Sequence, residues 1–461
     1  MTYIIWQRIV CIEQAVAGGN MRHIDFTSGP VGRKILLFSL PLMVGNVFQQ
    51  LYNVVDTLVV GKFLGEAPLA AVGSAYTLMI FLTSILIGLT MGAGVYFSLC
   101  FGWKNFDRMK QAVFISFLSI GLLTVIMNGA AYLLLDELIS FMQVPFEVIP
   151  YIRDYLWWIL AGLLAVFLYN FGAALLRAVG DSVTPLLFLI LSSLMNVALD
   201  ILFVVYLDFG VSGAAEATVI SQYVSGAGIF LYCFLFRKDF HISRKDMVWN
   251  RQVFCDMSEL SLLTSLQQSI MNFGILLVQG LVNSFGTTVM AAFAAGVKID
   301  TIAYSPLQDF GNAFSTYAAQ NWGAGNKARI RQGVITAGKM IFLFSILASC
   351  LVSLLAPTLM GFFVPETAEE VIAVGAHYLR IEGSCYLGIG ILFMLYGFYR
   401  AIKRAGMSVI LTILSLGTRV VLAYFLSSFP EIGVTGIWLS IPIGWALADM
   451  YGMIKGYKLV S

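Results

Sequence analysis

The chain has 461 residues, of which 59% are apolar and only 11% are charged. A soluble protein carries about 25% charged residues, so these charges cannot cover a water-exposed surface, and the composition indicates a polytopic membrane protein. The net charge of +2 excludes a broad basic field for nucleic acid. Three scattered histidines cannot assemble a His-rich metal site, and six cysteines without C-x-x-C spacing favour plain packing over a disulfide framework.

Residues 1–30 are predicted to form an N-terminal leader and a cytoplasmic segment, with residues 1–20 as an upstream extension. A membrane-spanning helix needs about 20 mostly apolar residues, and the rest of the chain holds twelve such stretches. They lie near 35–60, 68–98, 111–135, 151–176, 183–207, 211–236, 256–284, 288–318, 333–357, 369–398, 407–427 and 434–455. The predicted fold is therefore an all-α membrane protein of twelve transmembrane helices.

The basic residues set the expected orientation. Most of the 27 Lys and Arg fall in the termini and in the loops that follow even-numbered helices, whereas the other loops hold mainly acids. Because cytoplasmic loops carry the excess of Lys and Arg, both termini are predicted to be cytoplasmic.

The sequence is also an internal duplication. A shift of 221 residues aligns 65–113 with 286–334 without a gap and gives eleven identities. The most informative identical pairs are Gly65/Gly286, Tyr96/Tyr317, Gly102/Gly323, Asn105/Asn326 and Arg108/Arg329. Six helices per half predict two parallel repeats around a central cavity, with an N-terminal lobe at 31–236, a linker at 237–253 and a C-terminal lobe at 254–461. This architecture is typical of alternating-access transporters.

Polar residues recur on single faces of the N-terminal helices. In the first helix they are Asn46, Gln49, Asn53 and Asp56, in the fifth Ser192, Asn196 and Asp200, and in the sixth Thr218, Gln222 and Ser225. Amides and hydroxyls often only join helices, which is the interpretation we favour for the serines, Asn46 and Gln222. A carboxylate in lipid is costly, and neither aspartate has a Lys or Arg three or four residues away, so Asp56 and Asp200 are predicted to be functional.

The C-terminal half carries a different set of charges, which are Lys298, Asp300, Asp309, Arg380, Glu382 and Arg419. Of these, Arg380, Glu382 and Arg419 could pair across helices. A role in stabilising the lobe and a role in gating are equally compatible with these positions.

Several motifs together resemble the multidrug and toxic compound extrusion (MATE) transporters. They are Pro41-Leu-Met-Val-Gly-Asn46, Leu51-Tyr-Asn-Val-Val-Asp56-Thr, Gly61-Lys-Phe-Leu-Gly65, Leu176-Arg-Ala-Val-Gly-Asp181, Asn196-Val-Ala-Leu-Asp200, Gly210-Val-Ser-Gly-Ala-Ala215, Gly323-Ala-Gly-Asn326 and Gly433-Val-Thr-Gly436. The resemblance covers about residues 22–458 and agrees with two six-helix lobes.

The resemblance implies a drug antiporter and suggests which residues serve it. In the DinF-like branch the coupling ion is associated with positions that match Asp56, Asn196, Asp200 and Thr218, and the cavity positions match Gln49, Tyr52, Asn53 and Asn170. The NorM-type branch relies on an acid in the seventh helix and another in the tenth. This chain has Met271-Asn272 at the first place and Glu382 near the second, so we expect the DinF-like arrangement.

The predicted function is secondary active multidrug efflux: export of amphipathic organic cations or related compounds in exchange for H⁺ or Na⁺. The chain is expected to act as a monomer in the inner membrane, without a cofactor, and not as an enzyme. The alternative is a lipid-linked precursor flippase of the same superfamily, which twelve spans and an acidic N-terminal lobe disfavour. A membrane enzyme would need a catalytic cluster at one interface, and a channel would need a repeated filter; neither is visible.

Overall fold

A computed structural model describes residues 24–142, 144–237, 240–365 and 368–460, so the predicted leader at 1–20 lies outside the described residues. The first half holds α2 (Val31–Phe63), α3 (Glu66–Gly102), α4 (Phe106–Leu133), α5 (Leu135–Phe141), η1 (Phe146–Val148), α6 (Ile149–Ala161), α7 (Leu163–Ala178), α8 (Val183–Asp200), η2 (Ile201–Tyr206) and α9 (Gly210–Phe236). The second holds α10 (Arg251–Asn283), α11 (Thr287–Gly323), α12 (Lys327–Gly361), α13 (Glu369–Gly383), α14 (Tyr386–Ala401), α15 (Ala405–Ser427) and α16 (Val434–Val460). No described residue lies in a strand, and the all-α fold is confirmed.

Many of these helices can span a membrane. Among the described residues ten helical segments are long and apolar enough, and the pair α13–α14, bent by 51°, makes an eleventh. The helix α11 is 37 residues long but is not among them, because Lys298, Asp300 and Asp309 make its middle polar. The expected total of twelve therefore stays a prediction, while the multi-pass membrane fold is established.

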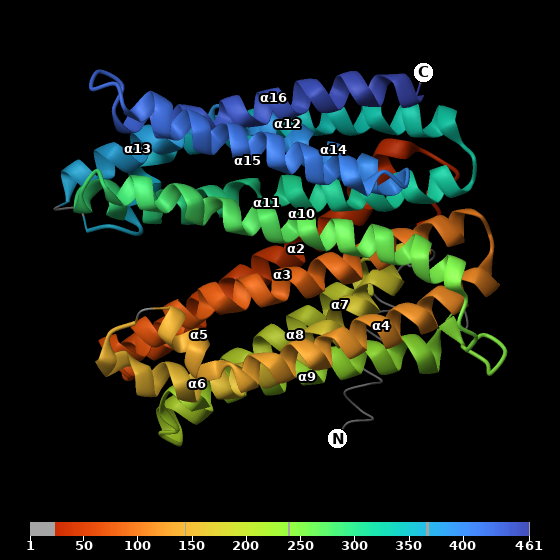
Figure 1. Cartoon of the computed structure of the whole chain (residues 1–461), viewed down its shortest axis with the longest axis horizontal. Coiled ribbons are helices and arrows are strands. Elements are labelled where there is room, and N and C mark those ends of the chain that lie inside the picture. Colours follow the sequence, from red (N-terminus) through yellow and green to blue (C-terminus); the bar gives the residue numbers. More distant parts are fainter. Residues whose placement is uncertain (1–23, 143, 238–239, 366–367, 461) are drawn as a thin grey trace.

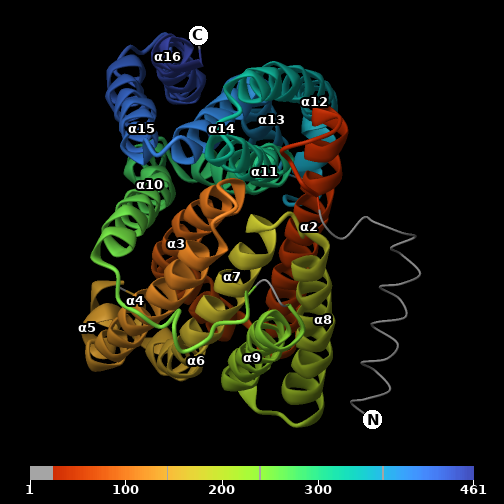
Figure 2. The ribbon, with the colours of Figure 1, turned by 90° about the vertical axis from the view of Figure 1, so that its right-hand side faces the viewer.

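Two groups of helices build the molecule. Figure 1 shows α3 to α9 in one group, here called the first group, and α10 to α16 in the other, the second group, and in Figure 2 α2 runs from beside α12 along the first group. The duplicated turns are equivalent in conformation as well as in sequence: Gly65 and Gly286, before α3 and α11, both have positive φ, 93° and 99°. A positive φ is readily adopted only by glycine, which explains why this residue recurs.

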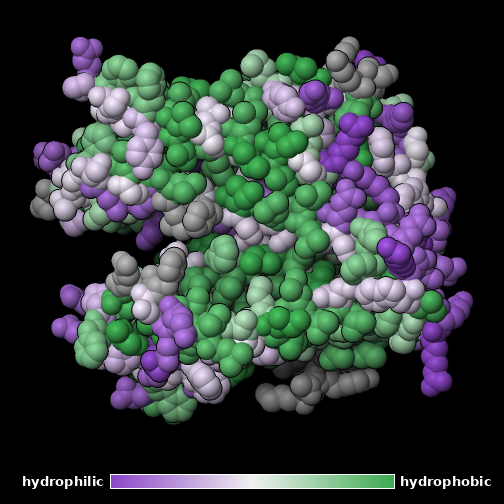
Figure 3. Space-filling model, in the orientation of Figure 1, coloured by the Kyte–Doolittle hydropathy of each residue, from purple (hydrophilic) through white to green (hydrophobic). Residues whose placement is uncertain are grey.

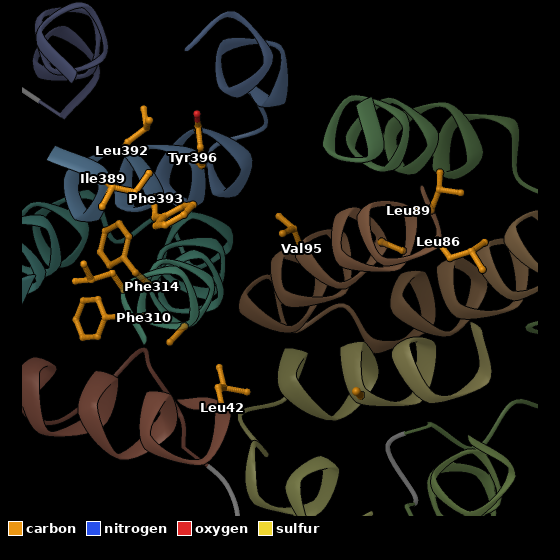
Figure 4. Packing of buried hydrophobic residues seen from close by; sticks show 14 of the residues in the cluster. Leu42, Leu86, Leu89, Val95, Phe310, Phe314, Ile389, Leu392, Phe393 and Tyr396 are labelled. Carbon is orange, nitrogen blue, oxygen red and sulfur yellow. The ribbon is translucent and has the colours of Figure 1, made fainter. Parts of the chain in front are cut away.

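The two groups meet where α3 crosses α10. A Cβ atom on Gly88 would lie 2.3 Å from the Cα of Ser265, and one on Gly92 would lie 2.5 Å from the Cα of Ser261. Small residues let membrane helices approach closely and gain van der Waals contact. Within the second group larger side chains fill the contact, and Figure 4 shows Phe314 of α11 and Phe393 of α14 in the apolar layer between their helices.

Two predicted spans are broken into shorter helices. The span at 151–176 is α6 followed by α7, with Gly162 between them, and the span at 369–398 is α13 followed by α14 after Gly383. Glycine is a poor helix former, and in both places a glycine lies at the break. Pro41, in contrast, lies inside α2 without ending it.

The ends of the helix bundle differ. Figure 3 shows a cleft that enters between the two groups at the end carrying α5 and α13, here called the open end. The opposite end, here called the closed end, carries residues 24–30 and the loops that join α3 to α4, α7 to α8, α9 to α10, α11 to α12 and α14 to α15.

The chain enters α2 through an ordered turn at the closed end. The carboxylate of Asp25 accepts hydrogen bonds from the backbone N–H of Thr27 (2.8 Å) and from its hydroxyl (2.6 Å). Partial burial opposes ionisation of Asp25, but these hydrogen bonds and the charge of Lys34 together hold its pKa below its ordinary value. This turn positions Phe26, whose side chain is fully buried.

Candidate functional site

The residues of the candidate site in the first group lie on α2, α8 and α9. On α8, Asn196 donates from Nδ2 to the Thr218 hydroxyl of α9 (3.2 Å) and more weakly to Oδ1 of Asp200 (3.5 Å). Residues four apart share a helix face, so Asn196 and Asp200 face α9 together. Both side chains are buried, with 2% and 0% exposure.

Asp56 of α2 completes this group, here called the N-lobe cluster (Asp56, Asn196, Asp200 and Thr218). Its side chain is 8% exposed, and the carboxylates of Asp56 and Asp200 lie close enough for their charges to interact. Tyr155 of α6 lies near both acids. The structure therefore brings all four predicted ion-coupling residues together inside the first group of helices.

The cluster is short of hydrogen-bond donors. Within the described part of the chain, three of its buried oxygens have no donor: Oδ1 of Asp56, Oδ1 of Asn196 and Oδ2 of Asp200. Buried polar groups are normally paired, because each unpaired one costs free energy. Three such oxygens in one place form a site that a proton or a small cation would complete.

The backbone changes at the same point. Asp200 is the last residue of α8, and the next six residues continue as the π-helix η2. Short π-helical segments are rare in proteins, and those that occur often lie at functional sites. The sequence pattern predicted one regular helix over 183–207, because the spacing of side chains carries no signal for this local widening.

The predicted cavity residues are more dispersed. On α2, Tyr52 lies near Gln49 and near Asp56, and Asn53 is partly exposed one turn before Asp56. Asn170 of α7 donates its amide to the carbonyl of Val166 in its own helix (2.8 Å). The structure thus places Tyr52 beside Asp56, with Gln49 next to Tyr52, and leaves the Asn170 amide engaged within α7.

A contact between the two groups lies nearer the start of α2, about one turn before Gln49. Asn46 donates from Nδ2 to Oδ2 of Asp309 on α11 (3.2 Å), and Arg177 at the end of α7 is near the same carboxylate. All three side chains are partly exposed. Asp309, a residue whose role the sequence left open, is therefore an acid of the second group that binds a polar residue of α2.

A second buried group of acids and phenols, here called the C-lobe cluster, contains Asp300, Tyr378, Glu382 and Tyr386. Tyr386 donates to Oδ1 of Asp300 (2.7 Å), Tyr378 donates to Oε2 of Glu382 (2.6 Å), and the two carboxyls lie against each other. The possible ion pairs of Arg380, Glu382 and Arg419 across helices are not among the ion pairs of the described residues, and Arg380 is exposed. Arg419 lies near the cluster instead.

Sequence reasoning missed three buried polar residues of the second half of the chain. Tyr378 is four positions before Glu382 on α13, so its spacing was a usable signal, but Tyr386 reaches Asp300 only through the fold. The third is Asp449 of α16, which is 4% exposed and has a buried Oδ1 without a donor in the described part of the chain. It was overlooked because α16 otherwise reads as a plain apolar span.

Known proteins share both the sequence pattern and the fold. The MatE family model matches residues 41–202 and again 263–425, once in each half. A probable multidrug resistance protein, YpnP of Bacillus subtilis, is 29% identical over 460 residues, covering 96% of this chain and 100% of that protein. A protein named FAD transporter in Shewanella oneidensis is 24% identical, covering 90% of this chain and 92% of its own length.

The fold agrees with a solved transporter. A multidrug resistance MATE family transporter of the MOP superfamily in an outward-facing conformation superposes with a TM-score of 0.91, at 24% identity, over 96% of this chain and 98% of that one. Members of this family are transport proteins rather than enzymes. Because the family model covers well over half of the chain, the chain belongs to the MATE family of multidrug efflux transporters.

Proposed function

We propose that the protein is a secondary active antiporter that exports amphipathic organic cations in exchange for H⁺ or Na⁺, with its coupling site in the N-lobe cluster as in the DinF-like branch. The observation that carries this proposal is the set of three buried oxygens without a donor, on Asp56, Asn196 and Asp200. A channel or a purely structural polar contact has no use for such a deficit, whereas an antiporter needs an ion site that is alternately filled and emptied.

The chemistry of the cluster suits both ions. Two carboxylates in a low dielectric cannot both stay charged without a large free-energy penalty, and a proton on either one removes the repulsion. Hard cations prefer oxygen ligands, which two carboxylates, the Asn196 carbonyl and the Thr218 hydroxyl would supply. Either ion therefore neutralises the cluster, and an empty cluster favours a second cationic ligand.

The cleft favours positively charged substrates. Tyr52 and Gln49 continue the polar face of α2 beyond Asp56, and Asp309 adds an acid from the opposite lobe. Aromatic rings and carboxylates attract organic cations through cation–π and Coulomb interactions. The same acids would repel an anionic substrate such as a lipid-linked diphosphate. They would also repel FAD, the substrate in the name of the Shewanella relative.

The transport cycle follows from this competition. Ion binding neutralises Asp56 and Asp200, α2 repacks, and the lobes at 31–236 and 254–461 rearrange about the linker at 237–253, with each state favouring one ligand. The excess of basic residues at the closed end supports a cytoplasmic location for that end and for both termini. The cleft then opens outward from the inner membrane, and one chain contains the complete site.

The test is efflux from proteoliposomes with the pH gradient and the Na⁺ gradient imposed separately. Ethidium, a neutral dye and FAD serve as substrates. The proposal expects gradient-driven transport of ethidium by the parent protein and its loss in Asp56→Asn. Transport of FAD or of an anionic lipid in place of ethidium would favour the flippase alternative.

A further inference from the structure

The duplicated loop motif has a structural role that the coupling site does not explain. In its two copies, Gly102 at the end of α3 and Gly323 at the end of α11 lie against each other's helix at the closed end. A Cβ on Gly102 would lie 2.1 Å from the carbonyl oxygen of Gln320, and one on Gly323 would lie 2.4 Å from that of Leu99. The main chains of the two lobes therefore touch here, and only glycine permits it.

The turns that follow these glycines have the same conformation. Lys104 has a φ of 56° and its counterpart Gly325 a φ of 71°, and each turn leads to an asparagine before the next helix. Asn105 accepts a hydrogen bond from the backbone N–H of Arg108 (2.9 Å) and so caps α4. Each copy of the motif thus delivers one arginine, Arg108 or Arg329, to the first turn of its following helix.

Arg108 reaches from the first lobe to the second. Its Nη2 lies 3.0 Å from Oδ2 of Asp256 on α10, and its Nε donates to the hydroxyl of Tyr96 (2.8 Å). Lys403, in the loop before α15, binds the same Asp256 oxygen (3.3 Å), and both cations lie over the ring of Trp103. A network of this kind is held more firmly than an isolated surface pair.

Arg329 reaches in the opposite direction. Its Nε donates to the carbonyl of Phe26 (2.8 Å), and its Nη2 donates to the carbonyls of Gly29 (2.8 Å) and Ser28. The Phe26 ring packs edge-on against Phe38 of α2 and Tyr317 of α11, with ring centres 5.2 and 5.7 Å away. The segment that leads into α2 is thereby tied to the second lobe.

Gln320 strengthens the same contact between the second lobe and the segment that leads into α2. Gln320 is fully buried; its Oε1 accepts from the backbone N–H of Phe26 (3.2 Å), and its Nε2 donates to the carbonyl of Ala178 at the end of α7 (2.8 Å). Asn321 donates to the carbonyl of Phe26 (3.1 Å). One short stretch of α11 therefore binds two separate parts of the first lobe.

We propose that the two copies of the duplicated motif form the gate of the closed end, with Arg108 and Arg329 as its reciprocal latches. Each arginine holds the chain that begins the first helix of the opposite lobe, α10 in one case and α2 in the other. Separation of the lobes at this end must break both sets of contacts and part the two glycines. The gate gives the transport cycle proposed above its second barrier, but its existence is measurable without any substrate.

A native cysteine reports the state of this gate. Cys100 is fully buried on α3, near Arg108 of its own lobe and near Asp256 and Lys403 of the other. In a protein whose other five cysteines are replaced by serine, the rate of N-ethylmaleimide labelling of Cys100 in nanodiscs measures how often the gate opens. Both faces of a nanodisc are accessible, so the measurement is independent of membrane orientation.

Arg108→Ala and Arg329→Ala are each expected to raise this rate about tenfold, the shift that loss of one hydrogen bond to a charged group produces. The exposed Arg331, on the same helix as Arg329, is the matched control, and Arg331→Ala should leave the rate within about twofold. Arg329→Lys and Asp256→Asn, which are the gentler changes if an alanine variant does not fold, should give a smaller increase. An unchanged rate in both the alanine variants and these replacements overturns the proposal.

The glycines provide an independent arm. Gly102→Ala should raise the labelling rate of Cys100, because a Cβ cannot fit against Gln320 in the closed state. Gly338→Ala on α12 is its control, since a Cβ there meets nothing within 4 Å. An equal rate in these two glycine variants contradicts the gate. A parent protein that shows the expected labelling pattern but moves no cation contradicts the proposed function and leaves the gate standing.

Discussion

The two lobes each bury a pair of acids among apolar helices, yet the two pairs differ in their supply of hydrogen-bond donors. In the C-lobe cluster, tyrosine hydroxyls donate to Asp300 and to Glu382. In the N-lobe cluster, the donor for two residues is the single amide of Asn196, and three oxygens remain without one in the described part of the chain. A buried acid with its donors in place needs no ligand, whereas a pair of acids without enough donors can be completed by an ion.

The difference shows that the number of acids in a lobe is a poor guide to function. Asp300 and Glu382 adjoin each other and each accepts a hydrogen bond from its own phenol, so they can hold one proton between them without an external ion. Asp56 and Asp200 also come from different helices and their charges interact, but in the described part of the chain Oδ1 of Asp56 and Oδ2 of Asp200 have no donor. Both clusters join acids from two helices, but only the N-lobe cluster lacks donors that an ion would replace, so we expect ion binding to alter the contact between helices there.

The largest expected effect comes from neutralising an acid of the N-lobe cluster, and the matched change in the C-lobe cluster is its control. Asp56→Asn and Asp200→Asn should each lower gradient-driven ethidium efflux by at least about tenfold, since the amide resembles a permanently neutral acid and cannot exchange an ion. Asp300→Asn should keep most of the transport. The measurement is initial efflux rate in proteoliposomes at matched protein content. A reversed result, with Asp300→Asn inactive and Asp56→Asn active, would break the comparison.

Ligand-dependent stability sharpens the same contrast. The ion that drives efflux should stabilise the parent protein against thermal unfolding, by about 1.4 kcal/mol at ten times its dissociation constant. Asp200→Asn should lose this stabilisation and Glu382→Gln should retain it. The check is the unfolding midpoint with and without NaCl, with choline chloride as the salt control, and across pH if Na⁺ has no effect. Equal loss in both variants would place the ion in both lobes.

The phenols of the C-lobe cluster should matter for stability rather than for transport. Tyr386→Phe and Tyr378→Phe each leave a buried carboxyl oxygen without its donor, which costs about 1–3 kcal/mol. We expect lower unfolding midpoints with ion coupling preserved in the surviving folded protein. Tyr304→Phe is a suitable control, because that residue lies near Asp300 but is not one of the two donors. Loss of coupling without loss of stability would argue that the C-lobe cluster takes part in transport.

The contact between the lobes should have a smaller and more selective effect. Asp309→Asn removes a carboxylate that Asn46 binds across the cleft, and we expect the KM for ethidium to rise a few-fold, about 1 kcal/mol of lost attraction. The KM of a neutral dye should be unchanged. Asn46→Ala, which frees Asp309 from its partner, should leave the charge preference intact. An equal rise for both dyes would mean that Asp309 acts through packing rather than through charge.

The smallest effect is expected for Asp449. No other acid of the described residues acts on its buried carboxylate, so Asp449→Asn should change efflux less than about twofold and should not weaken folding, because the variant removes a buried charge. Efflux and the unfolding midpoint provide the check. Lost efflux would show that a donor-poor acid in the second lobe also carries function, and the distinction between the lobes would then be one of degree.

The sequence alone determined the class of the protein and its organisation. Apolar stretches of spanning length, a gapless duplication at an interval of 221 residues and glycines at fixed places are local or periodic signals, and they specify helices, repeats and turns without reference to distant contacts. The same holds for the residues of the N-lobe cluster that lie four apart on α8, because helical periodicity alone puts Asn196 and Asp200 on one face.

Only the tertiary structure decided which polar residues have partners. The approach of Asp56 to Asp200, the bond between Asn46 and Asp309 and the donation from Tyr386 to Asp300 each join helices far apart in sequence. Spacing along a chain fixes the direction of a side chain within its own helix but not the helix that it meets. The shortage of donors that distinguishes the N-lobe cluster is therefore a property of packing, which no pattern in the sequence could express.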